Sequence, residues 1–356
     1  MRDKILLINP GSTSTKIALN DLNGKLWDKS ISHSLQELSK YDTIYDQLDM
    51  RYDLVASAVK ESGNSFDELA AVVSRGGPFA RVESGAYRVT KTMLEIIRTR
   101  PMDQHASNIG AAIAHKIARS QGIEAYIYDA VTVDEMIPLT RVTGLKEMER
   151  HGQGHNLNMR AAALAVCRKR DMDYYASNIL VAHLGGGITL SLHHNGRIID
   201  MISDDEGPFA PERSGGVPCF QLIELCYSGK YDKKAMFKHI QRAGGLVAHF
   251  GTSDTREVER RVLEGDEQAK LVYEAMALNV AKNLAKLSVV VDGNIDCVVL
   301  TGGIAYSKLF TEMVAKRVKF LGPLEIVPGE NEMQALYEGA LRVLRGEELA
   351  KEYEET

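Results

Sequence analysis

The chain has 356 residues, of which 44% are hydrophobic and 26% are charged, a balance typical of a globular protein with two domains of ordinary size. Its 43 basic and 48 acidic residues give a formal net charge of −5, and without a basic block or a membrane-length apolar run we expect neither nucleic acid nor a membrane as partner. The four cysteines are too scattered for a disulfide framework or zinc knuckle, and the first strand follows Met1 too closely for a signal peptide, so we expect a cytoplasmic protein.

Residues 5–20 predict a strand, a hydroxyl-rich loop and a second strand. The apolar start breaks at Asn9-Pro10-Gly11, and the chain becomes apolar again after Lys16. Backbone N–H groups, hydroxyls and an ammonium in such a loop suit a polyanion such as a nucleotide phosphate. On this stretch alone, an ordinary hairpin turn explains the pattern at least as well.

The same pattern returns at residues 178–199, where a strand, the turn Gly185-Gly186-Gly187 and an alternating strand precede another Asn-Gly pair. Asn23-Gly24 and Asn195-Gly196 lie about half the chain length apart, which predicts two similar halves. Two such turns facing each other would hold a nucleotide in an interdomain cleft. A coincidence between two common hairpins is the alternative.

Between these hairpins, two strands end in charged side chains. Residues 69–74 form a buried strand that ends at Arg75, and residues 125–128 form another that ends at Asp129. A guanidinium at a strand end suits a carboxylate or phosphate, although a plain ion pair is equally consistent. Asp129 would face a cation or ligand, or cap the next helix. Near the start of a helix over residues 105–121, His105 and Asn108 more plausibly cap it than face a ligand.

Two further loops carry candidate binding groups. His151 and His155 could hold zinc if they lay on a helix, but the glycines between them favour a loop, so we interpret these histidines as hydrogen-bond donors to an anion. In the loop 207–216, prolines fix the path and glycines allow close approach of the backbone around Arg213.

The remaining chain predicts helices over 220–225, 233–242, 254–261, 267–291 and 331–345, with strands over 296–300 and 320–327. The turn Gly302-Gly303-Ile304 is of a kind that faces an adenosine or its phosphates. We expect no ordered structure after Glu347.

Several motifs occur in the order in which they occur in one enzyme family: INPGSTSTK, SRGGPF, HASN, YDAVTVDEM, HGQGHN, HLGGG, GPFAPERSGG, LTGGIA and PGENEMQAL. The chain thereby resembles the acetate and butyrate kinases of the actin-like sugar-kinase and chaperone ATPase superfamily. The match covers nearly the whole chain, and INPGSTSTK and GPFAPERSGG look like the butyrate kinase branch.

The resemblance implies an α/β fold of two similar actin-like, ribonuclease H-like domains, each with a mixed five-stranded sheet, around a nucleotide cleft. We expect residues 1–150 with the C-terminal helix 331–356 to form the acyl and phosphate side, and residues 151–330 the nucleotide side. The implied reaction is reversible phosphoryl transfer between ATP and a short-chain carboxylate such as butyrate or isobutyrate, giving ADP and an acyl phosphate. We also expect a homo-oligomer built from dimers.

A fatty acid with a pKa of about 4 is ionised at neutral pH and needs no general base, so catalysis should consist of positioning and charge neutralisation. Arg75 and Arg213 are candidates to hold the carboxylate and screen the phosphoryl group. His151 and His183 are candidate donors to its equatorial oxygens, and Asp129 would orient an arginine or the magnesium shell.

The resemblance also assigns nucleotide, phosphate and metal contacts. The candidates for the nucleotide and its phosphates are Asn9, Ser12, Ser14, Lys16, Gly185, Gly186, Gly187, Gly302, Gly303 and Ile304. Glu332 and Asn9 are assigned to Mg²⁺, which keeps much of its water shell and so would meet Glu332 through water.

Two alternatives stay open at this point. Acetate or propionate kinase is the nearer one, because acyl pocket volume depends on side-chain directions that a sequence does not reveal. A non-catalytic ATP-binding protein of the actin fold is the other, although such a protein has no need of a cationic ring around the γ-phosphate.

Overall fold

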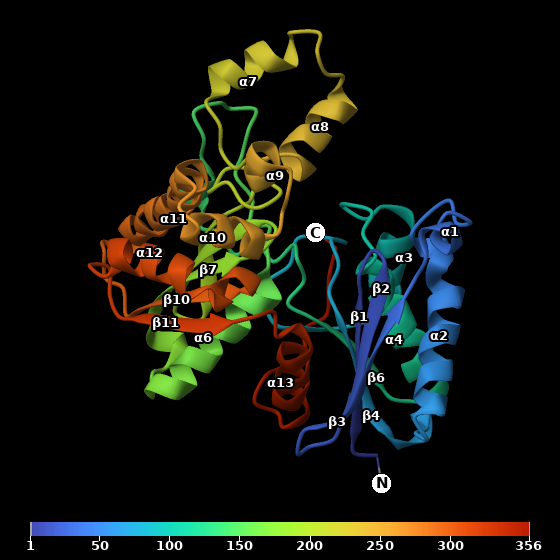
Figure 1. The fold of residues 1–356 in the computed structure, drawn as a ribbon. Coiled ribbons are helices and arrows are strands. Elements are labelled where there is room, and N and C mark those ends of the chain that lie inside the picture. The colour runs from blue at the N-terminus through green and yellow to red at the C-terminus, as the bar shows by residue number, and fades with distance from the viewer. Residues whose placement is uncertain (1, 356) are drawn as a thin grey trace. The chain divides into compact units, whose positions relative to one another are not determined.

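The computed structural model describes residues 2–355, which form two compact α/β units (Figure 1). The first unit combines the chain up to Asp134 with the part from Asn331 onward, and the second unit is Glu135–Glu330. Residues 135–150, assigned above to the first domain, therefore lie in the second unit. There the Ile137 amide donates to the Ile199 carbonyl over 3.0 Å, and Arg150 binds Glu206 over 2.8 Å.

The sheet of the first unit has the strand order β3-β2-β1-β4-β6-β5. Its strands are β1 (Lys4–Pro10), β2 (Ser14–Asn20), β3 (Lys25–Ser32), β4 (Leu69–Arg75), β5 (Ala86–Arg88) and β6 (Glu124–Tyr128). β1 pairs antiparallel with β2 and parallel with β4, which in turn pairs parallel with β6. The expected five strands are thus joined by a sixth, because the short β5 pairs antiparallel with β6.

The sheet of the second unit has the order β11-β10-β7-β8-β9. Its strands are β7 (Asn178–Leu184), β8 (Ile188–His194), β9 (Arg197–Ile202), β10 (Cys297–Gly302) and β11 (Leu324–Pro328). β7 pairs antiparallel with β8 and parallel with β10, as β1 does with β2 and β4. This shared topology confirms the two similar halves. In the β8–β9 turn both Asn195 and Gly196 have positive φ, as a tight Asn-Gly hairpin requires.

Helices cover both faces of the first sheet. They are α1 (Leu35–Leu38), α2 (Leu48–Glu61), α3 (Lys91–Thr99), α4 (Asn108–Gln121) and α13 (Glu332–Leu344). α4 and α13 each pack against β1 and β4, and Figure 1 shows them on opposite sides of this sheet. As a result, the first turn of α13 returns the chain to the strands on which Asn9 and Arg75 lie.

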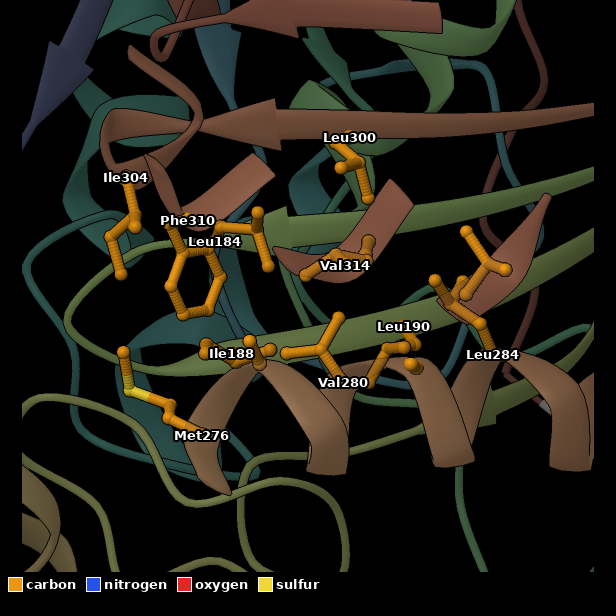
Figure 2. Close-up of a cluster of buried hydrophobic side chains, with 14 of the residues drawn as sticks. Leu184, Ile188, Leu190, Met276, Val280, Leu284, Leu300, Ile304, Phe310 and Val314 are labelled. Carbon is orange, nitrogen blue, oxygen red and sulfur yellow. The ribbon is translucent and has the colours of Figure 1, made fainter. Parts of the chain in front are cut away.

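The helices of the second unit are α5 (Pro138–Arg141), α6 (Asn156–Arg170), α7 (Cys219–Cys226), α8 (Lys233–Arg242), α9 (Gly245–Phe250), α10 (Thr255–Leu263), α11 (Glu267–Ser288) and α12 (Lys308–Val318). Side chains of α11 and α12, among them Val280, Leu284 and Phe310, form one buried cluster with Leu184 and Leu300 of the sheet (Figure 2). Burial of each such side chain contributes about 1.5–3 kcal/mol. This packing holds β7 and β10 in place, and candidate site residues lie at the ends of these strands.

The expectation that the chain is unordered after Glu347 is wrong. Lys351 pairs with β5, because its amide donates to the Ala86 carbonyl over 2.9 Å and its carbonyl accepts from the Arg88 amide over 2.8 Å. Glu348 accepts from the Tyr128 hydroxyl over 2.5 Å. These partners lie far away in the sequence, so local periodicity does not predict that the segment after Glu347 is ordered.

Candidate active site

The predicted phosphate loop of the first unit is a closed turn between β1 and β2. The Gly11 amide donates to the Ser14 carbonyl over 2.7 Å, which fixes the turn without a ligand. The side chains of Ser12 and Lys16 are exposed, and Ser14 is half-buried. The turn therefore offers a hydroxyl and an ammonium to solvent, as an anion-binding loop requires.

Two predicted residues of the first unit, Asn9 and Arg75, meet at the carboxylate of a third, Glu332. Glu332, in the first turn of α13, accepts from the Asn9 amide over 2.6 Å and from the Arg75 guanidinium over 2.7 Å. The Arg75 Nε is buried without a hydrogen-bond partner among the described residues. Arg75 thus keeps donor capacity beyond its ion pair, which suits a residue that binds an anion.

His105 precedes α4, whose N-cap is Ser107 and carries no side-chain capping bond, so the expected cap by His105 is wrong; the His105 ring lies in the electrostatic environment of this cluster. Its Nδ1 accepts from the Ser107 amide over 3.2 Å. Burial, followed by the positive charge of Arg75, lowers the pKa of His105, while Asp103 and Glu332 act in the opposite direction. The neutral imidazole is therefore favoured near neutral pH.

Asp129 lies directly after β6 in a left-handed conformation with φ of 39° and is buried. Its carboxylate accepts from the Gly85 amide over 2.7 Å, so it orients the loop before β5. The next residue, Ala130, touches the loop after Arg75 so closely that a Cβ on Gly76 would lie 2.7 Å from the Ala130 Cβ. The loops that follow Arg75 and Asp129 are therefore packed together.

In the second unit, His183 near the end of β7 is held in one tautomer. The amide nitrogen of Asn158 on α6 lies 2.9 Å from His183 Nδ1, and because this nitrogen can only donate, Nε2 carries the ring proton. The His183 Nε2 is 3.4 Å from a Glu330 oxygen and makes no hydrogen bond within the described chain. His155 stacks on the His183 ring at 3.9 Å with 7° between the planes. His183 is thus a pre-oriented donor.

The glycine turn after β7 lies against the loop that carries Arg213. The Gly186 carbonyl accepts from the Glu212 amide over 3.1 Å. A Cβ on Gly187 would lie 3.0 Å from an Asp204 oxygen, and that oxygen accepts from Arg213 Nε over 2.9 Å. The structure therefore brings His183, the glycine turn and Arg213 together, as the sequence predicts.

A cavity of 460 Å³ in the second unit is lined by both His151 and Arg213. Arg150 fixes the chain just before His151, because its guanidinium binds Glu206 over 2.8 Å and Asp200 over 3.1 Å. Burial alone would lower the pKa of Arg150, but these two carboxylates raise it overall. The predicted loop conformation of residues 151–155 is confirmed, since α6 begins at Asn156.

The predicted adenosine turn borders a second cavity. Gly303 and Ile304 line a space of 710 Å³ together with Arg256, Tyr306 and other residues of α10 and the short helix Gly303–Tyr306. Gly302 has a φ of 91°, and a Cβ there would lie 2.4 Å from the Leu184 carbonyl oxygen. Only glycine fits where β10 ends beside β7.

Sequence reasoning missed several residues that shape these sites: Arg51, Arg150, Asn158 and Asp204. His155, interpreted from the sequence as a hydrogen-bond donor to an anion, stacks on the His183 ring. The position of His155 inside the HGQGHN motif was the sequence signal that this residue belongs to the site. For residues 2–355, no group of three or more histidine, cysteine or acidic side chains forms a ready metal site.

Across the described helices, none is both long and apolar enough to cross a membrane.

The fold is shared with solved structures. An acetate kinase from Porphyromonas gingivalis superposes with a TM-score of 0.79 at 18% identity, covering 95% of this chain and 99% of that one. An acetate kinase from Entamoeba histolytica gives 0.76 at 16% identity, covering 94% and 98%. A ROK family protein from Streptococcus pneumoniae gives 0.52 at 14% identity, covering 97% and 99%. The protein thus shares the α/β fold of these structures, with two units that each contain one sheet.

The sequence comparisons define the family. The acetokinase family model matches residues 4–341. Butyrate kinase 2 of Clostridium acetobutylicum is 44% identical over 99% of this chain and its own full length. Butyrate kinase 1 of the same organism is 43% identical over 98% of this chain and 99% of its own. The chain belongs to the acetokinase family, which confirms the resemblance and makes it a carboxylate kinase that uses ATP.

Proposed function

We propose that the chain transfers the γ-phosphoryl group of ATP reversibly to butyrate or a branched acid of similar size, giving ADP and an acyl phosphate. The observation that carries the choice of substrate is the full-length similarity to two butyrate kinases. The convergence of His183, the glycine turn and Arg213 supports the reaction type, since these groups donate to an anion and carry positive charge.

In this reaction a carboxylate oxygen attacks the γ-phosphorus, a new O–P bond forms, and the bond to the β–γ bridging oxygen breaks as ADP leaves. The carboxylate is already ionised, so no side chain has to remove a proton. Arg213 and His151 lie in one cavity where they can bind the anionic reactants. His183 Nε2–H donates to a phosphoryl oxygen, and Arg75 neutralises charge from the first unit.

Magnesium fits the residues of the first unit. Mg²⁺ is commonly bound through one or two carboxylates, substrate phosphates and several waters, so a ready cluster of protein ligands is not required. Glu332 is held by Asn9 and Arg75 and still has lone pairs for metal-bound water. Asn9 and Glu332 would hold the hydrated ion, which supplies charge neutralisation on the phosphates. Asp129 supports the adjoining loops in this scheme.

The main alternative is preference for acetate or propionate. To decide, ATP is incubated with acetate, propionate, butyrate or isobutyrate in the presence of hydroxylamine, which converts acyl phosphate into a coloured hydroxamate. We expect the highest kcat/KM for butyrate or isobutyrate, by roughly tenfold or more over acetate, because each added methylene buries further apolar surface. Highest efficiency with acetate would support the alternative, and no hydroxamate with any acid would refute the kinase function.

We further propose a homo-oligomer built from dimers. Phe220 of α7 and Tyr227, the residue that directly follows this helix, are exposed at 86% and 88%, which is costly for a monomer in water. A second copy that covers α7 would bury them. Wild-type protein should run well above 39.3 kDa in solution, whereas a Phe220→Ser/Tyr227→Ser variant should dissociate. A wild-type monomer would contradict this proposal. We place the enzyme in the cytoplasm with its ATP, which cell fractionation would test.

A further inference from the structure

One arginine is fully buried beneath the β1–β2 turn, and its function is not explained by the chemistry above. Arg51 on α2 has 0% exposed surface. Its guanidinium donates to the carbonyl oxygens of Gly11, Ser12 and Ser14 over 2.8, 3.1 and 3.3 Å. It also donates to the Thr15 hydroxyl over 3.1 Å. One side chain thus contacts four residues of the predicted phosphate loop.

Two neighbours fix this guanidinium and extend its contacts. Gln47, one helical turn earlier, accepts from Arg51 Nη2 over 2.9 Å and from Nε over 3.2 Å. The Thr15 hydroxyl, which accepts from Arg51, lies 2.8 Å from His33 Nε2 and can donate to it. Burial lowers the pKa of His33, and the charge of Arg51 lowers it further, so this histidine is held as a neutral acceptor.

The direction of these hydrogen bonds matters for an anion. Carbonyl oxygens carry negative partial charge, and a turn that pointed them outward would repel phosphate. Arg51 draws three of them to the buried side of the turn. Its hydrogen-bond partners there are uncharged oxygens, which satisfy its N–H groups without cancelling its charge, and the negative charge of Glu37 acts on it only as a smaller effect than burial. Burial lowers the pKa of Arg51 to about 10, so the guanidinium stays charged at neutral pH.

We propose that Arg51 is a positioning residue for phosphate binding: it gathers the carbonyls of the β1–β2 turn beneath the loop and adds positive charge under the bound phosphates. This inference rests on the proposed kinase function and on the assignment of Ser12 and Lys16 to the nucleotide phosphates that the family resemblance implies. Arg51 itself does not touch the substrate. It acts through the turn that it holds.

The test compares Arg51→Met, which keeps volume but removes every donor, with Arg51→Lys, which keeps the charge but not the fork. Lys4→Met is the matched control, because Lys4 forms an ion pair with Glu68 over 2.8 Å at the other end of β1. Each protein is measured for kcat and KM with ATP, for calorimetric Kd with inorganic tripolyphosphate and with adenosine, and for melting temperature.

For Arg51→Met we expect kcat/KM for ATP to fall about 100-fold, as when a preorganised donor is lost, with a parallel loss of tripolyphosphate affinity. Adenosine affinity should change less than about twofold, because adenosine has no phosphates. Arg51→Lys should recover part of the loss, and Lys4→Met should match wild type in all three ligand measurements.

Normal tripolyphosphate and ATP parameters in Arg51→Met would overturn the inference, as would a parallel loss of adenosine affinity, which indicates general structural damage. If Arg51→Met does not fold, the same measurements are made on Arg51→Lys and Gln47→Leu. Wild-type kinetics in both of these variants would contradict the inference. Failure of the kinase function itself would be seen separately, as wild-type protein that binds tripolyphosphate but forms no acyl phosphate.

Discussion

Arg213→Ala should lower turnover by about three to five orders of magnitude, the range seen when an arginine that stabilises a transferring phosphoryl group is lost. The Arg213 side chain lines the cavity that contains His151, and Asp204 fixes its direction through Nε. In the proposed reaction, its removal takes positive charge from the position where the transition state gains negative charge. ADP should still bind, since Gly303 and Ile304 border a different cavity.

The measurement pairs steady-state hydroxamate formation with calorimetric binding of ADP. Arg197→Ala is a suitable control, because Arg197 is an exposed residue at the start of β9. Arg213→Lys should recover little, since a lysine cannot reproduce the two-pronged geometry of a guanidinium. Turnover within about tenfold of wild type in Arg213→Ala would remove this residue from the role assigned to it.

Arg75→Ala should produce a comparable loss of turnover, of about three orders of magnitude, for a second reason in addition to lost charge. Arg75 is the ionic partner of Glu332, so its removal leaves that carboxylate with the Asn9 amide and an uncompensated negative charge. Such a charge near the phosphates would repel them. We expect kcat to fall and the KM for the carboxylate to rise, while ADP still binds.

Glu332→Gln separates the two contributions of Arg75. Glu332→Gln alone should lose activity, because Glu332 is proposed to hold the metal ion, so the double variant Arg75→Ala/Glu332→Gln is compared with Glu332→Gln. If Arg75 serves mainly to neutralise Glu332, loss of Arg75 should cost little further activity in that background; if Arg75 binds the reactants, as we propose, the double variant should be far less active than Glu332→Gln. Equal activity of the double variant and Glu332→Gln would therefore contradict the assignment.

The sequence predicts features that depend on local pattern. The two hairpins, each with an Asn-Gly turn, predict the repeated sheet, and the structure shows it, with β5 as an additional strand in the first unit. Strand ends predict where Arg75 and His183 lie, because side chains at strand ends are placed by the sheet itself. Charged or small residues at those positions are visible in a single sequence without any knowledge of their partners.

Features that depend on distant partners could not be predicted in this way. Arg51 holds a loop about forty residues earlier, and its own helix shows only an ordinary amphipathic pattern around it. Asn158 meets His183 across the α6–β7 contact, and no spacing rule connects the two. Lys351 pairs with β5 for the same kind of reason. Each of these contacts arises only when the sheets and helices have been packed.

The most direct test of this account follows the phosphorus atom itself. ATP, butyrate and magnesium are mixed with the wild-type protein or with Arg213→Ala, and the products are followed by phosphorus NMR. We predict that butyryl phosphate and ADP appear in equal amounts with the wild-type protein and that the variant forms neither at a comparable rate. ADP appearing together with inorganic phosphate from the outset, without butyryl phosphate, would show ATP hydrolysis instead and would contradict the account.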